Sequence, residues 1–284
     1  MNWLDEGALY SQIALFLRED LGRGDITSQA IIARNTRARG RFVSAEKMIV
    51  AGLEAAEEVF LSLDSQQQLE AFASDGEEIQ EGKVIARITG FADILLAGER
   101  VALNLIQRLS GIATVTNRFV RAVEGTRATI VDSRETTPGL RMLEKYAVLL
   151  GGGRSLRCGL DDGVSITPNH IAMAGGVAKA IDEAKRRLGH LHRIEVLIAN
   201  ENELRQALDA GAEKILLDHL NLDEVSHLTS LIRQLSPAML VQYSGTVTLE
   251  NVRLFAESGV DMIALGTLTN SMQVAAVEFR LQPF

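Results

Sequence analysis

The chain has 284 residues, of which 46% are hydrophobic, and a formal net charge of -8. This length suits one large domain or two modest ones, and the apolar fraction is sufficient for a core. The acidic balance argues against a broad surface for nucleic acid, although a local basic pocket can exist inside an acidic envelope. We therefore expect a small-molecule ligand and no nucleic-acid partner.

Three features of the sequence bear on where the protein works. The single cysteine, Cys158, cannot form an internal disulfide. The first residues, MNWLDEGALYSQ, lack the basic start and the apolar core of a signal peptide. No apolar run approaches the roughly 20 residues that a membrane-spanning helix needs. We expect a soluble, cytoplasmic protein without a membrane partner.

The first part of the chain is typical of a mixed α+β region. An amphipathic helix is predicted over 7–21, short strands over 39–50, and a second helix over 53–63. After these elements, Gly76, Gly82 and Gly90 are expected at turns between short strands. A long helical pattern over 94–123 follows, and we expect this helix to link two domains.

Beyond this helix, strand-like runs alternate with amphipathic stretches. The runs are ATIVD, VSIT, RIEVLIA, KILLD, AMLVQYS and DMIALG, with helical stretches near 139–150, 175–188, 201–210, 222–235 and 249–258. Such alternation predicts a parallel sheet covered by helices. A barrel of TIM type is the natural closure, and a doubly wound open sheet is the alternative. No dinucleotide or Walker-type glycine motif follows any of the strands.

Polar or small residues follow several of these strands. In a barrel the carboxyl ends of the strands share one face, and active sites lie there. The ends SGT and GTL offer free backbone N–H groups and favour phosphate binding, although each glycine can equally serve as a simple turn. The strand-end residues are Arg134, Glu135, Thr167, Asp218, His219, the stretch 242–245, Gly266 and Thr267.

The stretch over 132–170 combines a polar strand end, a glycine-rich turn and two arginines. Arg134 follows the apolar run that ends at Val131, and Arg157 follows the three glycines at 151–153. The guanidinium fork of arginine binds planar carboxylates or phosphates in pairs of hydrogen bonds. The stretch therefore favours an anion site, and the alternative is a surface loop with ordinary salt bridges.

Several motifs in order along nearly the whole chain resemble one known family. They are LREDLGRGDITS, GERVALNLIQRLSGIAT, TTPGLRMLEKYAV, GGG followed by RCGLDD, AGAEKILLD and GVDMIALGTLTNS. Together they resemble the quinolinate phosphoribosyltransferase family, also called nicotinate-nucleotide pyrophosphorylase. Members join quinolinate to phosphoribosyl pyrophosphate with magnesium, and they release pyrophosphate and carbon dioxide to give nicotinate mononucleotide.

The resemblance implies an α/β fold with an N-terminal α+β sandwich domain and an incomplete TIM-like α/β barrel. The expected domains are 1–115, joined by the segment 271–284, and 116–270, which carries the site. It also implies a homodimer or a higher assembly such as a hexamer, in which the N-terminal domain of one subunit completes the site of another. Magnesium is the implied cofactor, and no organic cofactor is expected.

Carried over by position, the resemblance assigns roles to residues of this chain. Arg100, Arg134 and Arg157 match the arginines that clasp the carboxylates of the substrate. Asp218 and Glu195 take the catalytic positions, and Asp218 is the expected magnesium ligand. The other substrate-binding positions are Glu135, Thr167, His170, Leu197, His219, Tyr243, Ser244, Gly245, Gly266 and Thr267.

The half of the site that handles the phosphoribosyl group departs from the family pattern. Glu135 and Thr167 replace lysines, Leu156 replaces a histidine, and Leu197 replaces the second glutamate of a Glu-Val-Glu motif. A like-charge contact at about 4 Å costs about 4 kcal/mol at an effective dielectric of about 20, so Glu135 should disfavour a phosphate. Alternatively, Glu135 pairs harmlessly with Arg134 or Arg141. These departures indicate a diverged member of the family.

Three functions remain open from the sequence. The first is an enzyme that acts on the N-glycosidic bond between a pyridine carboxylate and ribose 5-phosphate, with an altered substrate or reaction. The second is a non-catalytic or regulatory relative that binds a dicarboxylate or a mononucleotide. The third, an unrelated barrel aldolase or lyase, lacks a strand-end lysine for a Schiff base.

Overall fold

The computed structural model describes residues 6–189 and 191–284, and these divide into two compact units. The first unit comprises residues up to 117 together with 136–152 and 268–284, and the second comprises 118–135 and 153–267. The segment 136–152 therefore belongs to the first unit, whereas the sequence placed it with the barrel. The helix that ends the N-terminal region continues from the first unit into the second.

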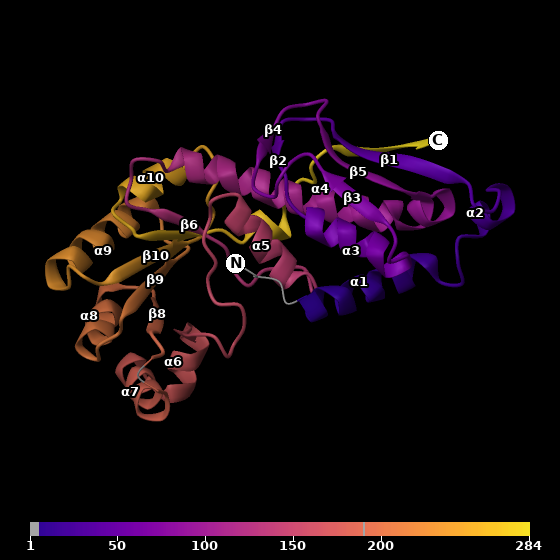
Figure 1. Ribbon diagram of the computed structural model, residues 1–284. Helices are drawn as coiled ribbons and strands as arrows, with labels where there is room; N and C mark the ends of the chain where they lie inside the picture. The colour runs from indigo at the N-terminus through magenta and orange to yellow at the C-terminus, as the bar shows by residue number, and fades with distance from the viewer. Residues whose placement is uncertain (1–5, 190) are drawn as a thin grey trace. The chain divides into compact units, whose positions relative to one another are not determined.

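The first unit is built on a four-stranded antiparallel sheet in the order β12, β1, β5, β3 (Figure 1). These strands are β12 (Val277–Pro283), β1 (Arg37–Ser44), β5 (Val84–Phe91) and β3 (Gln68–Ala71), and a small ribbon pairs β2 (Met48–Ile49) with β4 (Glu78–Ile79). Ala86 and Ile88, which alternate along β5, are fully buried and mark the core face of this strand. Gly90 lies inside β5 and not at the predicted turn, and the side chain of Gln67 fills the space that a Cβ atom would need there.

Helices supply the rest of the core of this unit. α1 (Glu6–Leu21) packs on α3 (Leu53–Leu63), and α4 (Ala92–Ala122) follows β5 directly. The predicted helices at 7–21, 53–63 and 94–123 are confirmed, while α2 (Ile26–Ile31) was not expected. Asp25 begins α2, since its carboxylate accepts hydrogen bonds from the backbone N–H groups of Thr27 and Ser28.

The last strand of the chain pairs with the first strand of this sheet. β12 runs antiparallel to β1, with Phe279 opposite Phe42 and their ring centroids 4.8 Å apart. The ring of Phe279 also covers Gly40, where it leaves no room for a Cβ atom. Glycine at this position is therefore a condition for the close approach of the two strands.

A buried ion pair holds the segment 136–152 within the first unit. Glu144, at the start of α5 (Arg141–Leu150), is fully buried and pairs with Arg108 of α4 at 2.6 Å. Arg108 also donates hydrogen bonds to the hydroxyl of Thr137 and to the carbonyl of Thr269, at 2.6 and 3.2 Å. The carboxylate of Glu144 accepts a further bond from the N–H of Thr137. One network thus ties three separate segments together.

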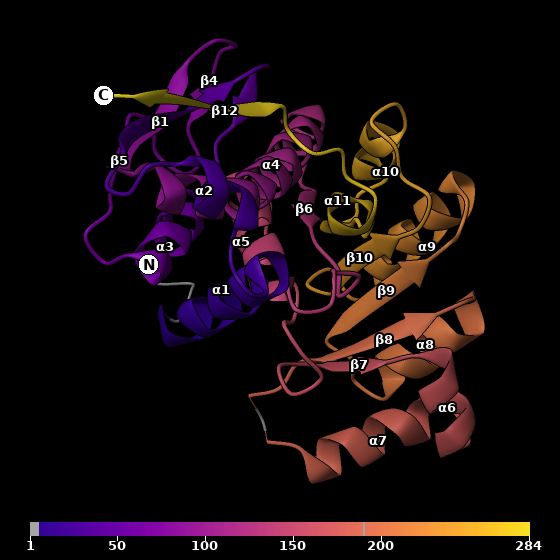
Figure 2. The ribbon, with the colours of Figure 1, turned by 90° about the vertical axis from the view of Figure 1, so that its right-hand side faces the viewer.

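The second unit is a six-stranded parallel sheet in the order β6, β11, β10, β9, β8, β7 (Figure 2). The strands are β6 (Thr129–Val131), β7 (Val164–Ile166), β8 (Ile194–Ile198), β9 (Lys214–Asp218), β10 (Leu240–Ser244) and β11 (Met262–Ala264). Their order folds back on the first strand as in a barrel, but β6 and β7 do not pair, so the barrel is incomplete. The predicted α/β fold is confirmed.

Helices cover one face of this sheet. They are α6 (Pro168–Ala174), α7 (Val177–Arg187), α8 (Glu201–Asp209), α9 (Leu222–Leu235) and α10 (Val252–Glu257), and a short α11 (Thr267–Asn270) follows β11. Val196, Ile198, Ile215 and Leu217 alternate along β8 and β9 and are fully buried. Side chains of the intervening residues consequently face the inside of the incomplete barrel. Among the described residues, no helix combines the length and the apolar character needed to cross a membrane.

Candidate active site

The inside of the incomplete barrel holds a cavity of about 390 Å³ in the second unit. Apolar walls come from residues such as Leu156, Leu216, Leu240 and Met262. Charged and polar side chains complete the lining: Ser133, Arg134, Arg157, Ser165, Arg193, Glu195, Lys214, Gln242 and Ser244. The structure therefore brings together six of the residues that the sequence singled out, namely Arg134, Leu156, Arg157, Glu195, Gln242 and Ser244.

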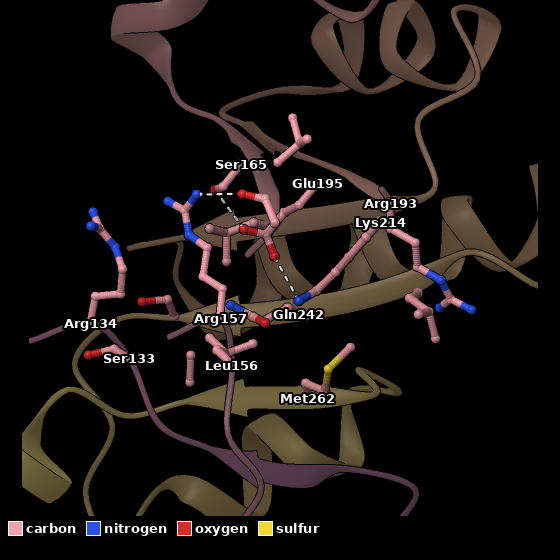
Figure 3. Close-up of a pocket in the computed structure, with 16 residues that line it drawn as sticks. Ser133, Arg134, Leu156, Arg157, Ser165, Arg193, Glu195, Lys214, Gln242 and Met262 are labelled. Carbon is pink, nitrogen blue, oxygen red and sulfur yellow. Dashed lines mark hydrogen bonds and ion pairs between the residues drawn. The ribbon is translucent and has the colours of Figure 1, made fainter. Parts of the chain in front are cut away.

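The two arginines reach the cavity from loops that the end of β6 holds in place. Asp132, which is fully buried, accepts a hydrogen bond from the N–H of Leu156 at 2.8 Å, and Arg154 bridges to Val131. Arg157 follows directly, and its Nη1 donates to the carbonyl of Gly163 at 2.8 Å. Arg134 is exposed and lines the cavity. In Figure 3 both arginines lie on the side of the cavity opposite Lys214 and Arg193.

A chain of polar contacts crosses three neighbouring strands inside the barrel (Figure 3). Glu195 of β8 accepts a hydrogen bond from Ser165 of β7 at 2.8 Å and pairs with Lys214 of β9 at 2.7 Å. Strand register explains this row, because Ser165 is paired with Glu195 and Glu195 with Lys214. The predicted catalytic residue Glu195 is therefore neutralised by a lysine, and its carboxylate is not free for a metal ion unless this pair opens.

Gln242 lies one level farther toward the carboxyl ends of the strands. Its side chain is 2% exposed and lines the cavity, and its Oε1 has no hydrogen-bond partner among the described residues. The register pairs it with Leu216 on one side and Met262 on the other. A buried acceptor without a partner costs free energy, so it marks a place where a ligand group can supply the missing donor.

Asp218 stands at the carboxyl end of β9, beside a strained residue. Its Oδ1 is 3.0 Å from Nδ1 of His219, and His219 has a φ of 54°, in the left-handed region that non-glycine residues seldom adopt. The N–H of His219 donates to the carbonyl of Ser244 at 2.8 Å, which holds this backbone. Such strain is typical of functional sites.

The magnesium ion that the resemblance implies finds few ligands in this chain. Among residues 6–189 and 191–284, no group of three His, Cys, Asp or Glu side chains is placed to hold a metal ion. Leu197 offers no oxygen, and Glu195 is engaged by Lys214. Asp218 alone does not make a protein site for Mg²⁺, which prefers octahedral oxygen ligands. The residues present do not fit a magnesium site built by the protein.

Thr167 and His170 start α6. The N–H of Thr167 donates to Nδ1 of His170 at 3.1 Å, and the Thr167 hydroxyl is 2.7 Å from the same nitrogen. His170 lines a groove beside the cavity, together with Arg157. Both residues thus take part in a helix start, which the sequence did not predict because the helix is short.

The glycines expected to cradle phosphate have side chains of this chain against them. The carboxylate of Glu135 lies against Gly266 and leaves no room there for a Cβ atom. Gly245 lies against the hydroxyl of Tyr243. Thr267 is exposed and begins α11. A negative charge therefore stands at one of the two places where a phosphate was expected.

Three predicted binding residues lie outside the lining of the cavity. Tyr243 is buried on the face of β10 opposite Gln242, stacks on Phe255 with ring centroids 4.3 Å apart, and donates to the carbonyl of Leu220. Burial and the negative charge of Asp218 raise the pKa of Tyr243. Leu197 alternates with buried residues of β8 and so faces inward, but it does not line the cavity. Arg100 is exposed on α4, in the first unit.

Sequence reasoning missed several residues that line the cavity, above all Lys214, Ser165 and Arg193. A signal for two of them existed, because Lys214 and Ser165 are polar residues within the strand-like runs KILLD and VSIT. In a barrel strand such a residue faces the interior, where it needs a partner or a ligand.

Comparison with known proteins places the chain among these enzymes. The family model for the N-terminal domain of quinolinate phosphoribosyl transferase matches residues 25–110, and the model for its C-terminal domain matches 112–282. A probable nicotinate-nucleotide pyrophosphorylase [carboxylating] of Bacillus subtilis is 44% identical over 91% of this chain and 88% of its own. A similarly named protein of Synechocystis is 41% identical over 88% of this chain and 84% of its own.

Solved structures agree with the sequence matches. A nicotinate-nucleotide pyrophosphorylase from Francisella tularensis superposes with a TM-score of 0.92 at 33% identity, covering 98% of each chain. The enzyme of the same name from Ehrlichia chaffeensis gives a TM-score of 0.91 at 35% identity, covering 98% of this chain and 99% of its own.

Proposed function

Because the chain belongs to the quinolinate phosphoribosyltransferase family, an enzyme family of pentosyltransferases, we propose that it acts on the N-glycosidic bond between a pyridine carboxylate and ribose 5-phosphate. The observation that carries this proposal is the cavity in which Arg134 and Arg157 meet apolar walls. Arginine forks suit the carboxylates, and the apolar walls suit the flat ring.

The reaction is proposed to differ from that of ordinary members. Glu135 puts a carboxylate at Gly266, and Leu197 has no charge with which to stabilise a positive charge developing on the ribose. Glu195 is engaged by Lys214 and Ser165. These three features should weaken the binding and the reaction of phosphoribosyl pyrophosphate. They leave unchanged the arginines that are proposed to bind the carboxylate of the ring. We therefore propose an altered substrate or an altered direction of the reaction.

A second candidate function rests on the same observations. If the site no longer transfers a phosphoribosyl group, the protein is a binding or regulatory relative that binds a dicarboxylate or a mononucleotide. Product detection separates the two: pyridine carboxylates are incubated with phosphoribosyl pyrophosphate and Mg²⁺, and mononucleotides are sought by chromatography. Mg²⁺ belongs in the assay because it commonly binds through substrate phosphates and few protein carboxylates. Ring acids that bind without any product would favour the second function.

The arginines are predicted to bind the carboxylate directly. Replacing Arg134 or Arg157 by alanine should weaken binding of pyridine-2,3-dicarboxylate by about 1.5 to 3 kcal/mol, the range for hydrogen bonds to charged groups. Isothermal titration measures this loss. The matched control is Arg205→Ala, since Arg205 is an exposed arginine that pairs with Glu201 on α8. Unchanged affinity in both cavity variants would mean that these arginines stabilise their loops and do not bind the carboxylate.

The site is predicted to be shared between subunits, with Arg100 of one subunit serving the cavity of another. Sedimentation should then give a dimer or a multiple of it. Arg100→Ala and Arg157→Ala should each lose binding, yet a mixture of the two should regain about a quarter of the sites, because half of the randomly formed dimers carry one intact site. An active monomer, or a mixture without regained sites, would contradict this arrangement.

A further inference from the structure

The inner end of the cavity has a polar floor, in which the family resemblance gives a role to Glu195 alone. Ser165, Glu195 and Lys214 form its connected row, at 2.8 Å and 2.7 Å, and the side chain of Gln242 stands one level above it. The side chains of Lys214 and Glu195 are 13% and 15% exposed, and Gln242 is 2% exposed. The row is therefore an enclosed, internally neutral group and not a solvated surface pair.

Depth separates this floor from the carboxyl ends of the strands. Lys214 is the first residue of β9 and Asp218 the last, and strand geometry of about 3.3 Å per residue puts these levels about 13 Å apart. Gln242 lies between them on β10, level with Leu216. A ring whose carboxylate is held by Arg134 and Arg157 can extend past Gln242 toward Lys214. Figure 3 draws Lys214 on the other side of the cavity from both arginines, and Gln242 between them.

The floor offers both kinds of hydrogen-bonding partner. Oε1 of Gln242 is a buried acceptor that lacks a donor among the described residues. Nζ of Lys214 has three donors, and Glu195 is its ion-pair partner, so the ammonium retains capacity for an acceptor. An ionised carboxylate carries no donor for Oε1 of Gln242, whereas a neutral group with both a donor and an acceptor satisfies the two sites at once.

We infer that this floor is a specificity subsite for a neutral carboxamide-like substituent on the ring, opposite the carboxylate that the arginines bind. Its N–H donates to Oε1 of Gln242, and its carbonyl accepts from Nζ of Lys214. This inference rests on the proposed function, because it assumes a ring acid in the cavity, but it adds a substrate class: a pyridine carboxylate that carries an amide or a similar group on its far side.

The test compares two probes that differ in one group. Pyridine-3-carboxylate is prepared with either a carbamoyl or an acetyl group at position 6, so that a methyl replaces the donor NH₂ while the carbonyl is kept. Titration without any phosphoribosyl donor should show the carbamoyl acid binding about tenfold more tightly, as expected for one hydrogen bond to a buried acceptor. In Gln242→Leu the two acids should bind within about twofold of each other.

A second variant tests the hydrogen bond from Lys214 to the carbonyl of the substituent, and it leaves no unpaired charge buried. Lys214→Met combined with Glu195→Gln removes both charges and should weaken the two acids by the same factor, about threefold to tenfold, because both keep the carbonyl. The preference for the carbamoyl acid should persist in this variant. Melting temperatures without ligand provide the folding control, and Gln242→Leu should melt no lower than the wild type because it removes an unpaired buried acceptor.

The outcomes separate this inference from the proposed function. Equal binding of the two acids by the wild type, or a preference that survives in Gln242→Leu, would overturn the subsite. Binding of plain pyridine-3-carboxylate with rejection of both substituted acids would show that the floor is closed and would overturn it too. Failure of every ring acid to bind would overturn the proposed function together with the subsite.

Discussion

Supplied with quinolinate, phosphoribosyl pyrophosphate and Mg²⁺, the protein is expected to release pyrophosphate roughly a hundredfold more slowly than its Bacillus subtilis relative. The reason is the carboxylate of Glu135 against Gly266. An unscreened like-charge contact of about 4 kcal/mol would correspond to about a thousandfold, and the exposure of Glu135 lets solvent and salt reduce it. Parallel pyrophosphate-release assays of the two proteins measure the ratio, and equal rates would contradict the expectation.

Restoring the missing charges tests the cause of the slow reaction. The triple variant Glu135→Lys, Thr167→Lys and Leu197→Glu should recover at least about tenfold in rate, because it returns the phosphate partners and a carboxylate that can stabilise charge on the ribose. The matched control for charge is Glu257→Lys, on the exposed side of α10, which should leave the rate unchanged. A folded triple variant without any gain would show that these positions do not explain the slow reaction.

The second large effect concerns stability of the first unit. Arg108→Met should lower the free energy of unfolding by about 3 to 5 kcal/mol, because it leaves the fully buried carboxylate of Glu144 without its cation. Urea unfolding followed by circular dichroism measures the loss. The variant also removes the hydrogen bonds from Arg108 to Thr137 and Thr269, so the segments around these residues should lose protection from hydrogen exchange first.

Two controls isolate the buried charge as the cause. The double variant Arg108→Met with Glu144→Leu should be more stable than Arg108→Met alone, since a buried pair exchanged for apolar residues is often tolerated. Arg205→Met removes an exposed pair with Glu201 and should cost less than about 1 kcal/mol. If the double variant lost as much stability as the single one, packing and not charge would explain the effect.

Much of the fold could be predicted because its signals are periodic. The six apolar runs of the second unit became β6 to β11, and helices at 53–63 and 222–235 were predicted to the residue. Short elements gave no such signal. α6 spans seven residues and is defined by the contact between Thr167 and His170, and the place of Gly90 within β5 depends on Gln67, which is distant in sequence.

The site was less accessible to sequence reasoning, for a physical reason. Strand-end residues such as Arg134 and Ser244 follow from the general rule that barrel sites lie at the carboxyl ends, and Arg157 was singled out because it follows the three glycines at 151–153. The pairing of Glu195 with Lys214 depends on strand register, which sets which residues of β8 and β9 meet. Likewise, Tyr243 was assigned to the ligand, but the alternation of side chains along β10 turns it toward Phe255.

The pairing of β12 with β1 has a consequence for the order in which the protein folds. Nearly the whole length of the chain separates Gly40 from Phe279, yet the ring of Phe279 lies directly over that glycine. During synthesis, β1 emerges before its neighbour β5, and its other edge stays unpaired until β12 leaves the ribosome. The parallel sheet of the second unit can form before β12 is available. The antiparallel sheet of the first unit, although it begins earlier in the chain, is therefore completed after it. An exposed β1 edge is a template for wrong pairing, which makes the nascent chain vulnerable to aggregation until β12 is available.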